Sequence, residues 1–142
     1  MKVVSVLRVL VGTLLLFSAA GCTENNATAA PLWTNYAAAQ QALANDNFEQ
    51  AKTALTALAA ESTGDLQKQI QTAAAAADID GMRMAFRSAS DTLIQNGVPA
   101  EYAVAFCPMY KGGASWVQKK GPIVNPYTGK SMPGCGSFKS KS

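Results

Sequence analysis

Sulfur-bearing side chains are the residues of this chain with the clearest chemistry. Cys107 and Cys135 each have a methionine nearby, with Met109 two residues after the first cysteine and Met132 three residues before the second. The chain contains no histidine, which excludes Ser-His-Asp and Cys-His nucleophiles and the usual zinc hydrolase sites. Thiolate and thioether ligands without imidazole suit soft ions such as Cu(I) or Ag(I). These four residues are therefore a candidate soft-metal site.

The same two cysteines are also candidates for a disulfide, which is the default for paired thiols in an oxidising compartment. Between Cys107 and Cys135 lie 27 residues, and closing a loop of that length stabilises a fold by about 3.5 kcal/mol on the chain-entropy account. Residue types alone favour the disulfide over the metal site, and both interpretations remain open.

The N-terminus indicates export. The first eight residues carry two basic side chains, an apolar run extends over residues 9–17, and small residues then lead to Gly21 and Cys22. A basic start, an apolar stretch too short to span a bilayer comfortably and a small-residue exit are the parts of a secretory signal. The sequence therefore predicts a signal peptide over residues 1–21.

Cys22 and the residues after it indicate a lipoprotein. Gly21-Cys22 resembles a bacterial lipobox, in which the thiol is acylated and becomes the first residue of the mature protein. Residues 22–31 are polar or small, as a flexible tether requires. We expect a lipid anchor on Cys22 that faces the periplasm, and Thr23 in place of an acidic residue favours the outer over the inner membrane.

Residues 32–98 contain four helical patterns, in which apolar residues recur at intervals of three and four. The last pattern follows the capping residue Asp78, and its predicted buried face consists of Ile79, Met82, Phe86, Ala89 and Leu93. Short turns join the four segments. The sequence therefore predicts an all-α fold, an antiparallel bundle of about four helices.

Residues 99–142 form a tail with a different composition, rich in glycine, proline, cysteine, methionine and aromatic residues. The tail is too short of apolar periodicity for a fifth long helix, so we expect irregular ordered loops and short strands packed on the bundle.

Charge is distributed unevenly between the two parts. Residues 32–101 hold eight acidic against four basic side chains, a net charge of −4, whereas six lysines and no acidic residue follow from Tyr102 onward, a net charge of +6. We expect the basic tail to pack on the acidic helices, and the alternative is an anionic partner or surface. Nucleic acid is not expected as the partner of an exported chain.

The tail resembles domain-of-unknown-function family 3347. The likeness lies in Cys107-Pro-Met109, Trp116, Asn125-Pro126-Tyr127, Gly129, Met132 and Cys135-Gly136, and upstream in Arg83, Phe86 and Ser90. It covers about residues 33–138, nearly the whole predicted mature chain. Members of that family combine helices with a tail rich in cysteine, methionine and glycine. They occur as stand-alone envelope proteins and as appendages of adaptor subunits in heavy-metal efflux systems.

The resemblance implies a role in copper or silver handling. With it, the sequence supports a metal site and a disulfide at Cys107 and Cys135 equally. By position, Cys107, Met109, Met132 and Cys135 match the family's cysteines and methionines, and the residues that match those shaping the tail are Trp116, Asn125, Pro126, Tyr127 and Gly129.

Two functions follow from the sequence. The first is a lipid-anchored envelope protein that binds Cu(I) or Ag(I) in metal efflux or tolerance, with efflux components as partners. The second is a metal-free protein-interaction module in which Cys107 and Cys135 form a structural disulfide. No combination of residues predicts an enzyme.

The lipid anchor is tested by replacing the cysteine that would carry it. Cys22→Ser is expected to abolish labelling by a radioactive fatty acid and to release the protein into the soluble fraction, because the acyl chains that would anchor it are no longer attached. Equal membrane retention of the variant would contradict the lipobox interpretation.

Overall fold

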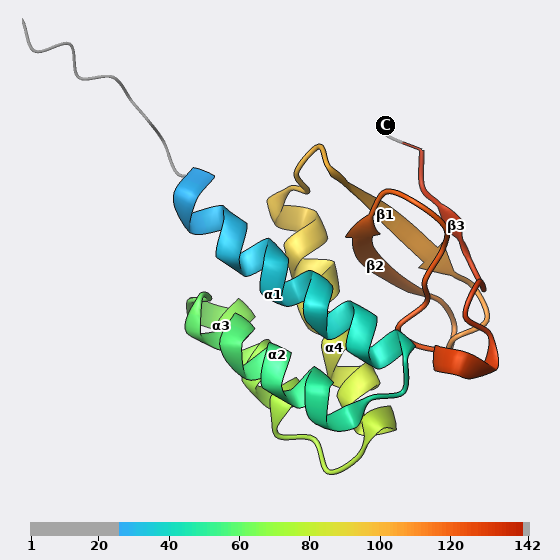
Figure 1. The fold of residues 1–142 in the computed structure, drawn as a ribbon, viewed down its shortest axis with the longest axis horizontal. Coiled ribbons are helices and arrows are strands. Elements are labelled where there is room, and N and C mark those ends of the chain that lie inside the picture. The colour runs from blue at the N-terminus through green and yellow to red at the C-terminus, as the bar shows by residue number, and fades with distance from the viewer. Residues whose placement is uncertain (1–25, 141–142) are drawn as a thin grey trace, which may run out of the picture.

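Four helices followed by a small antiparallel sheet make up the fold (Figure 1). The computed structural model describes residues 26–140, so the predicted signal peptide, Cys22 and the start of the predicted tether lie outside the described residues. The helices are α1 (Asn26–Ala44), α2 (Phe48–Ala60), α3 (Gly64–Ala74) and α4 (Ile79–Asn96). The strands are β1 (Tyr102–Cys107), β2 (Ala114–Lys119) and β3 (Ser137–Phe138), and a short 3-10 helix, η1, covers Gly129–Ser131.

The four predicted helices are confirmed. The Asn47 side chain caps α2 by accepting the Gln50 N–H at 3.1 Å, and the Asp78 side chain caps α4 by accepting the Gly81 N–H at 2.7 Å. Helix α1 begins at Asn26, so residues 26–31 of the predicted tether are helical. None of the helices in the described range is long and apolar enough to cross a bilayer.

The predicted all-α fold class is wrong, because the tail contains a three-stranded antiparallel sheet with the order β2-β1-β3. In the β1–β2 hairpin, Tyr102 lies opposite Lys119 and Cys107 lies opposite Ala114. Five consecutive residues of β2, Ala114 to Gln118, are buried. A strand buried on both faces lacks the alternation of apolar and polar residues that would predict it from the sequence.

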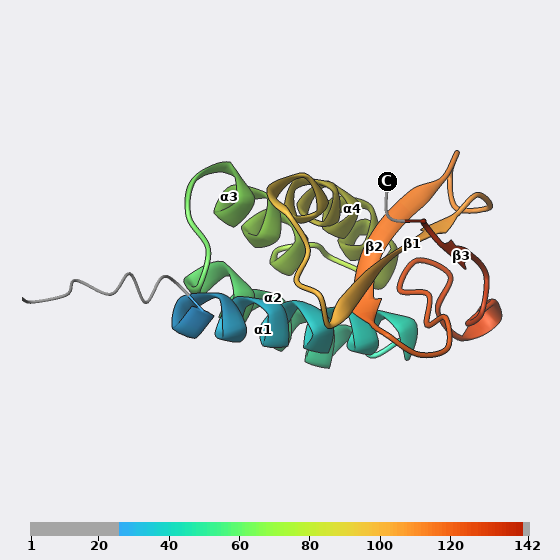
Figure 2. The same cartoon turned by 90° about the horizontal axis from the view of Figure 1, so that it is seen from above.

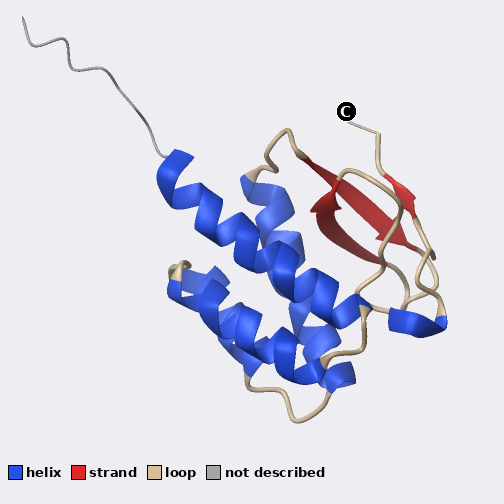
Figure 3. Cartoon of the chain, in the orientation of Figure 1, coloured by secondary structure: helices blue, strands red, loops and turns tan. Residues whose placement is uncertain are grey.

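The sheet and the helices share one core. The strands gather on one side of the helices (Figures 2 and 3), and aromatic side chains connect the two parts. Phe86 of α4 stacks on Tyr36 of α1 with ring centroids 5.1 Å apart, and its centroid lies 6.3 Å from that of Tyr127 in the tail. Trp116 of β2 meets Tyr127 edge-on at 6.0 Å. The tail is therefore an integral part of the fold.

A buried hydroxyl group also joins the helices to the sheet. The Tyr36 hydroxyl lies 2.8 Å from the Ser90 hydroxyl on α4 and accepts the Val117 N–H of β2 at 3.1 Å. Burial raises the pKa of Tyr36, so the side chain stays neutral in its hydrogen bonds.

Arg83 ties the tail to the helices through a guanidinium group that is almost fully buried, with the residue 6% exposed. Its Nε donates to the Pro126 carbonyl at 2.8 Å, and its Nη2 donates to the Leu43 carbonyl at 2.8 Å and to the Asp46 carboxylate at 2.5 Å. The hydrogen bond from Arg83 lowers the pKa of Asp46. Gly129 approaches both charged groups so closely that a Cβ would collide with them, and its φ of 54° is one that glycine adopts without strain.

Removal of the Arg83 guanidinium is expected to weaken the whole fold. Arg83→Met keeps a long side chain but leaves the Pro126 carbonyl without its donor and the Asp46 carboxylate without its ion pair, so the free energy of unfolding should fall by about 3 kcal/mol. Urea denaturation measures the change. The matched control is Arg87→Met one turn later on α4, where the side chain is half-buried and reaches only the Lys111 carbonyl, at 3.4 Å. The control should lose about 0.5 kcal/mol or less. Equal losses in the two variants would contradict this role of Arg83.

Candidate functional site

The structure brings together the two cysteines that the sequence singles out. Cys107 is the last residue of β1 and is fully buried, whereas Cys135 lies in the loop before β3 and is partly exposed. Their Sγ atoms are 2.9 Å apart, and both thiols are free. A disulfide bond of about 2.05 Å would require the two atoms to move about 0.9 Å closer. The pair can therefore be oxidised to a disulfide or can present two sulfur ligands to one ion.

Asn125 fixes the loop that carries Cys135. Its side-chain amide donates to the Cys135 carbonyl at 2.7 Å, and its side-chain oxygen accepts the N–H groups of Tyr127 and Thr128 at 2.8 and 3.2 Å. Its own backbone N–H donates to the Pro133 carbonyl at 2.9 Å. A single buried side chain thus holds both ends of the segment from residue 125 to residue 135.

The two thiols have opposite pKa shifts. Burial acts to raise the pKa of Cys107, but hydrogen bonds from the Cys135 thiol, from the backbone N–H groups of Met109 and Tyr110 and from the Asn125 side chain outweigh it, and the pKa is lowered. The hydrogen bond to Cys107, together with partial burial and the charge on Cys107, raises the pKa of Cys135. Cys107 is therefore the first of the pair to become a thiolate.

The two predicted methionine ligands lie at the surface. Met109 is 69% exposed and Met132 is 44% exposed. The backbones of the two methionines nevertheless contact the cysteines. The Met109 N–H donates to the thiols of Cys107 and Cys135, and the Met132 carbonyl accepts the Cys135 N–H at 3.1 Å. Within residues 26–140, no group of three or more His, Cys, Asp or Glu side chains is arranged to hold a metal ion. Any metal at this place would therefore depend on sulfur ligands.

The residues assigned to shaping the tail are all buried: Trp116, Asn125, Pro126, Tyr127 and Gly129. The Tyr127 hydroxyl donates to the Ser115 carbonyl of β2 at 2.7 Å, which fixes the loop after Asn125 on the sheet. Thr128, which stands at the surface end of this turn, donates its hydroxyl to the Met132 carbonyl at 2.6 Å. These contacts explain why the turn is ordered.

Gln118 is a structural residue of the tail that sequence reasoning did not identify. Its side-chain oxygen accepts the Trp116 indole N–H and the Val124 N–H, both at 3.0 Å, and its amide donates to the Pro122 carbonyl at 2.8 Å. The sequence does contain a signal for this role, because Gln118 follows Trp116 and Val117 in a short apolar run. A polar side chain that is buried there requires hydrogen-bond partners.

Comparison of the chain with protein-family models, with curated proteins and with solved structures finds no match in any of the three. The chemistry of the site is therefore derived from the residues of this chain.

The proximity of the two thiols predicts that a disulfide forms readily and stabilises the fold. In a Cys22→Ser chain, mild oxidation should consume two thiols and raise the free energy of unfolding by about 3.5 kcal/mol relative to the reduced protein. Urea denaturation with and without a reductant measures this. The denaturation should remain a single transition, because the sheet and the helices share one core.

The control is the Cys22→Ser, Cys135→Ser chain, whose stability should not respond to the reductant. Two free thiols that persist after oxidation of the Cys22→Ser chain would contradict the pairing.

Proposed function

We propose that this chain is a lipid-anchored envelope protein that binds one soft monovalent ion, Cu(I) or Ag(I), through Cys107 and Cys135. The observation that carries the proposal is the 2.9 Å contact between the two sulfur atoms. Asn125 and the strand β1 hold the backbones of the two residues side by side, so both sulfur atoms can reach one ion once the side chains move apart to admit it.

The types of ligand support a soft ion. Thiolate and thioether sulfur are soft and polarizable and select Cu(I) among the common metals, whereas Zn(II) sites usually complete four ligands with imidazole, thiolate or carboxylate. Met109 and Met132 are exposed beside the two cysteines in the sequence and supply additional thioether ligands in this proposal. Two thiolates and a monovalent cation give a complex with one net negative charge.

The pKa shifts give the proposed site a pH dependence. Both thiols must lose their protons to bind the ion. The pKa of Cys107 is lowered and that of Cys135 is raised, so the proton on Cys135 is the one that competes with the metal. The affinity for Cu(I) should therefore rise with pH until the pKa of Cys135 is passed.

The proposed cellular role is metal tolerance at the envelope. Its support is the lipoprotein-like N-terminus and the resemblance of the tail to the family that also occurs in heavy-metal efflux adaptors. In this role the protein faces the periplasm from the outer membrane and sequesters Cu(I) or Ag(I) or passes it to efflux components.

A second candidate function is a protein-interaction module with a structural Cys107–Cys135 disulfide. The same 2.9 Å separation favours it, since the two sulfur atoms need only a small movement to bond. The disulfide would leave no thiolate for a metal, so the two functions exclude each other in a given redox state.

Competition with a Cu(I) chelator under anaerobic reducing conditions tests the metal proposal. The Cys22→Ser chain should bind about one Cu(I) or Ag(I) and bind Zn(II) far more weakly. Adding Cys107→Ser and Cys135→Ser should weaken Cu(I) binding by at least about 100-fold, or about 2.8 kcal/mol. Met109→Leu or Met132→Leu should cost about tenfold, because a thioether donates no charge.

The control for the methionine variants is Met84→Leu on α4, which replaces another exposed methionine (54% exposed) and should leave the affinity unchanged. Undiminished Cu(I) binding by the double cysteine variant would place the site elsewhere and favour the interaction module.

A further inference from the structure

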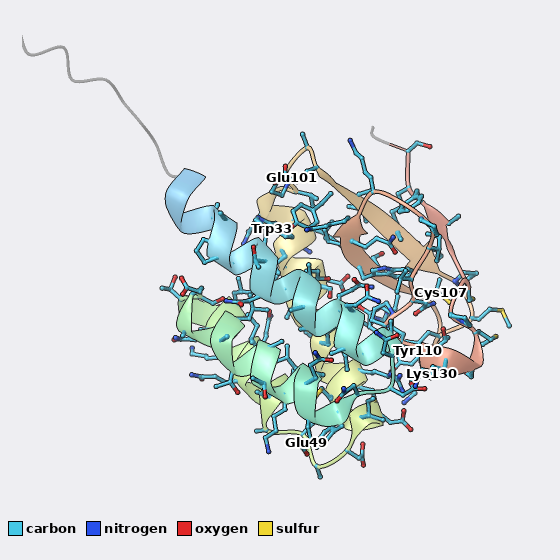
Figure 4. The ribbon with its side chains drawn as sticks, in the orientation of Figure 1. Trp33, Glu49, Glu101, Cys107, Tyr110 and Lys130 are labelled. Carbon is cyan, nitrogen blue, oxygen red and sulfur yellow. The ribbon has the colours of Figure 1, made fainter. Side chains whose placement is uncertain are left out.

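The segment before β1 and the end of β2 lie next to each other at one end of the sheet (Figure 1). Lys119 lies opposite Tyr102, and the Lys120 N–H donates to the Glu101 carbonyl at 3.4 Å. The Trp33 side chain of α1 packs on Tyr102 with ring centroids 5.3 Å apart. Figure 4 shows Trp33 and Glu101 at this end and Cys107 and Lys130 at the other end of the sheet. The predicted lipid anchor, Cys22, precedes α1 by only a few residues.

Three lysines near this part of the sheet have no acidic partner among the described residues. Lys119 and Lys120 lie at and just after the end of β2, and Lys139 follows β3, where its backbone N–H donates to the Val104 carbonyl in the middle of β1 at 2.8 Å. Lys119, Lys120 and Lys139 are exposed, and none of them lies within 4.0 Å of a described carboxylate. The ammonium group of Lys139 lies 5.2 Å from the centroid of the Phe106 ring, a contact that leaves its charge uncompensated by an anion. The basic tail packs on the helices, as expected, but these three ammonium groups form no ion pair with the described acidic side chains. Glu101 is the nearby acidic residue, so this end keeps an excess of positive charge.

An apolar groove lies between these lysines. It has a volume of 620 Å³ and is lined by Ile94 near the end of α4, by Val98 after that helix and by Val104 of β1, with Lys120 and Lys139 also in its wall. All three apolar side chains are half-buried. A groove with an apolar wall and ammonium groups is complementary to an amphiphile with an anionic headgroup.

We propose that the surface around this groove binds anionic phospholipid, with Lys119, Lys120 and Lys139 contacting phosphate groups and the groove accepting apolar atoms beneath the headgroup. This inference rests on the proposed function in one respect: the proposed lipid anchor on Cys22 is what would bring the start of α1 close to a membrane. A basic cluster and a lipid chain on the same side of a domain reinforce each other, since a single weak contact does not hold a protein firmly on a membrane.

The candidate metal site lies at the far end of β1 from Tyr102 and Lys119. Cys107 is about 17 Å from Tyr102 at about 3.4 Å per residue. Lys139 lies between the two ends, since its ammonium group is over the ring of Phe106, the residue before Cys107.

Binding to vesicles tests the proposal without the anchor. A chain of residues 23–142 retains every described core residue, since these lie between Ala29 and Cys135, and it lacks Cys22. It should sediment with vesicles containing phosphatidylglycerol, less so as salt is raised, and not with vesicles of phosphatidylcholine alone. Replacing Lys119, Lys120 and Lys139 by Gln should weaken binding roughly 100-fold.

The matched control replaces three exposed lysines elsewhere, Lys52, Lys68 and Lys111, by Gln. It has the same net charge as the test variant and should bind as the parent does. A third variant, Val98→Glu, leaves all lysines in place and should weaken binding at least tenfold if the groove is used. Urea denaturation confirms that each variant is folded.

Three results would overturn the proposal: no sedimentation with anionic vesicles at low salt, equal losses in the two lysine triples, or full binding by Val98→Glu. Stronger binding to a polyglutamate peptide than to the vesicles would also overturn it, in favour of an acidic protein segment. Failure of the lipid anchor is detected separately by fatty-acid labelling of Cys22 and does not affect the vesicle result.

Discussion

The buried guanidinium of Arg83 is the interaction on which the arrangement of the tail depends. A buried charge is stable only when its hydrogen-bonding groups are satisfied, and Arg83 finds its acceptors at the end of α1, in the turn at Asp46 and at Pro126 of the tail. The end of α1 with the adjoining turn, α4 and the tail are distant in the sequence and must therefore meet around one side chain. Gly129 is needed at the same place, because any Cβ there would occupy the space of the two charged groups.

The candidate site is a consequence of this arrangement. Pro126, which Arg83 holds through its carbonyl, follows Asn125, and Asn125 in turn holds the Cys135 carbonyl. Cys107 is placed independently by the β1–β2 pairing and by the aromatic core below the sheet. The two thiols therefore meet only when the helices, the sheet and the loop are all in place. This explains how two residues on an irregular segment and a short strand can hold a fixed geometry for an ion or a disulfide.

The sequence predicted those features that have a regular spacing of apolar residues or a characteristic side-chain chemistry. The four helices follow from apolar spacing and, for α4, from the cap Asp78, and the pairing of Cys107 with Cys135 follows from the chemistry of their thiols. The all-α class was wrong because Ala114 to Gln118 are buried without alternation, and because helices dominate the chain. Local patterns also could not show that the tail lysines remain unpaired or that Arg83 connects the two parts, since both depend on which distant segments meet.

X-ray absorption at the copper edge of the anaerobically reduced, Cu(I)-loaded Cys22→Ser chain tests the central claim most directly, namely that the Cys107–Cys135 pair is a soft-metal site. The account predicts a first shell of two to four sulfur atoms and no nitrogen or oxygen. It also predicts that this sulfur shell disappears when Cys107 and Cys135 are both replaced by serine. A first shell of nitrogen or oxygen atoms, or a sulfur shell that survives the double replacement, would contradict the claim.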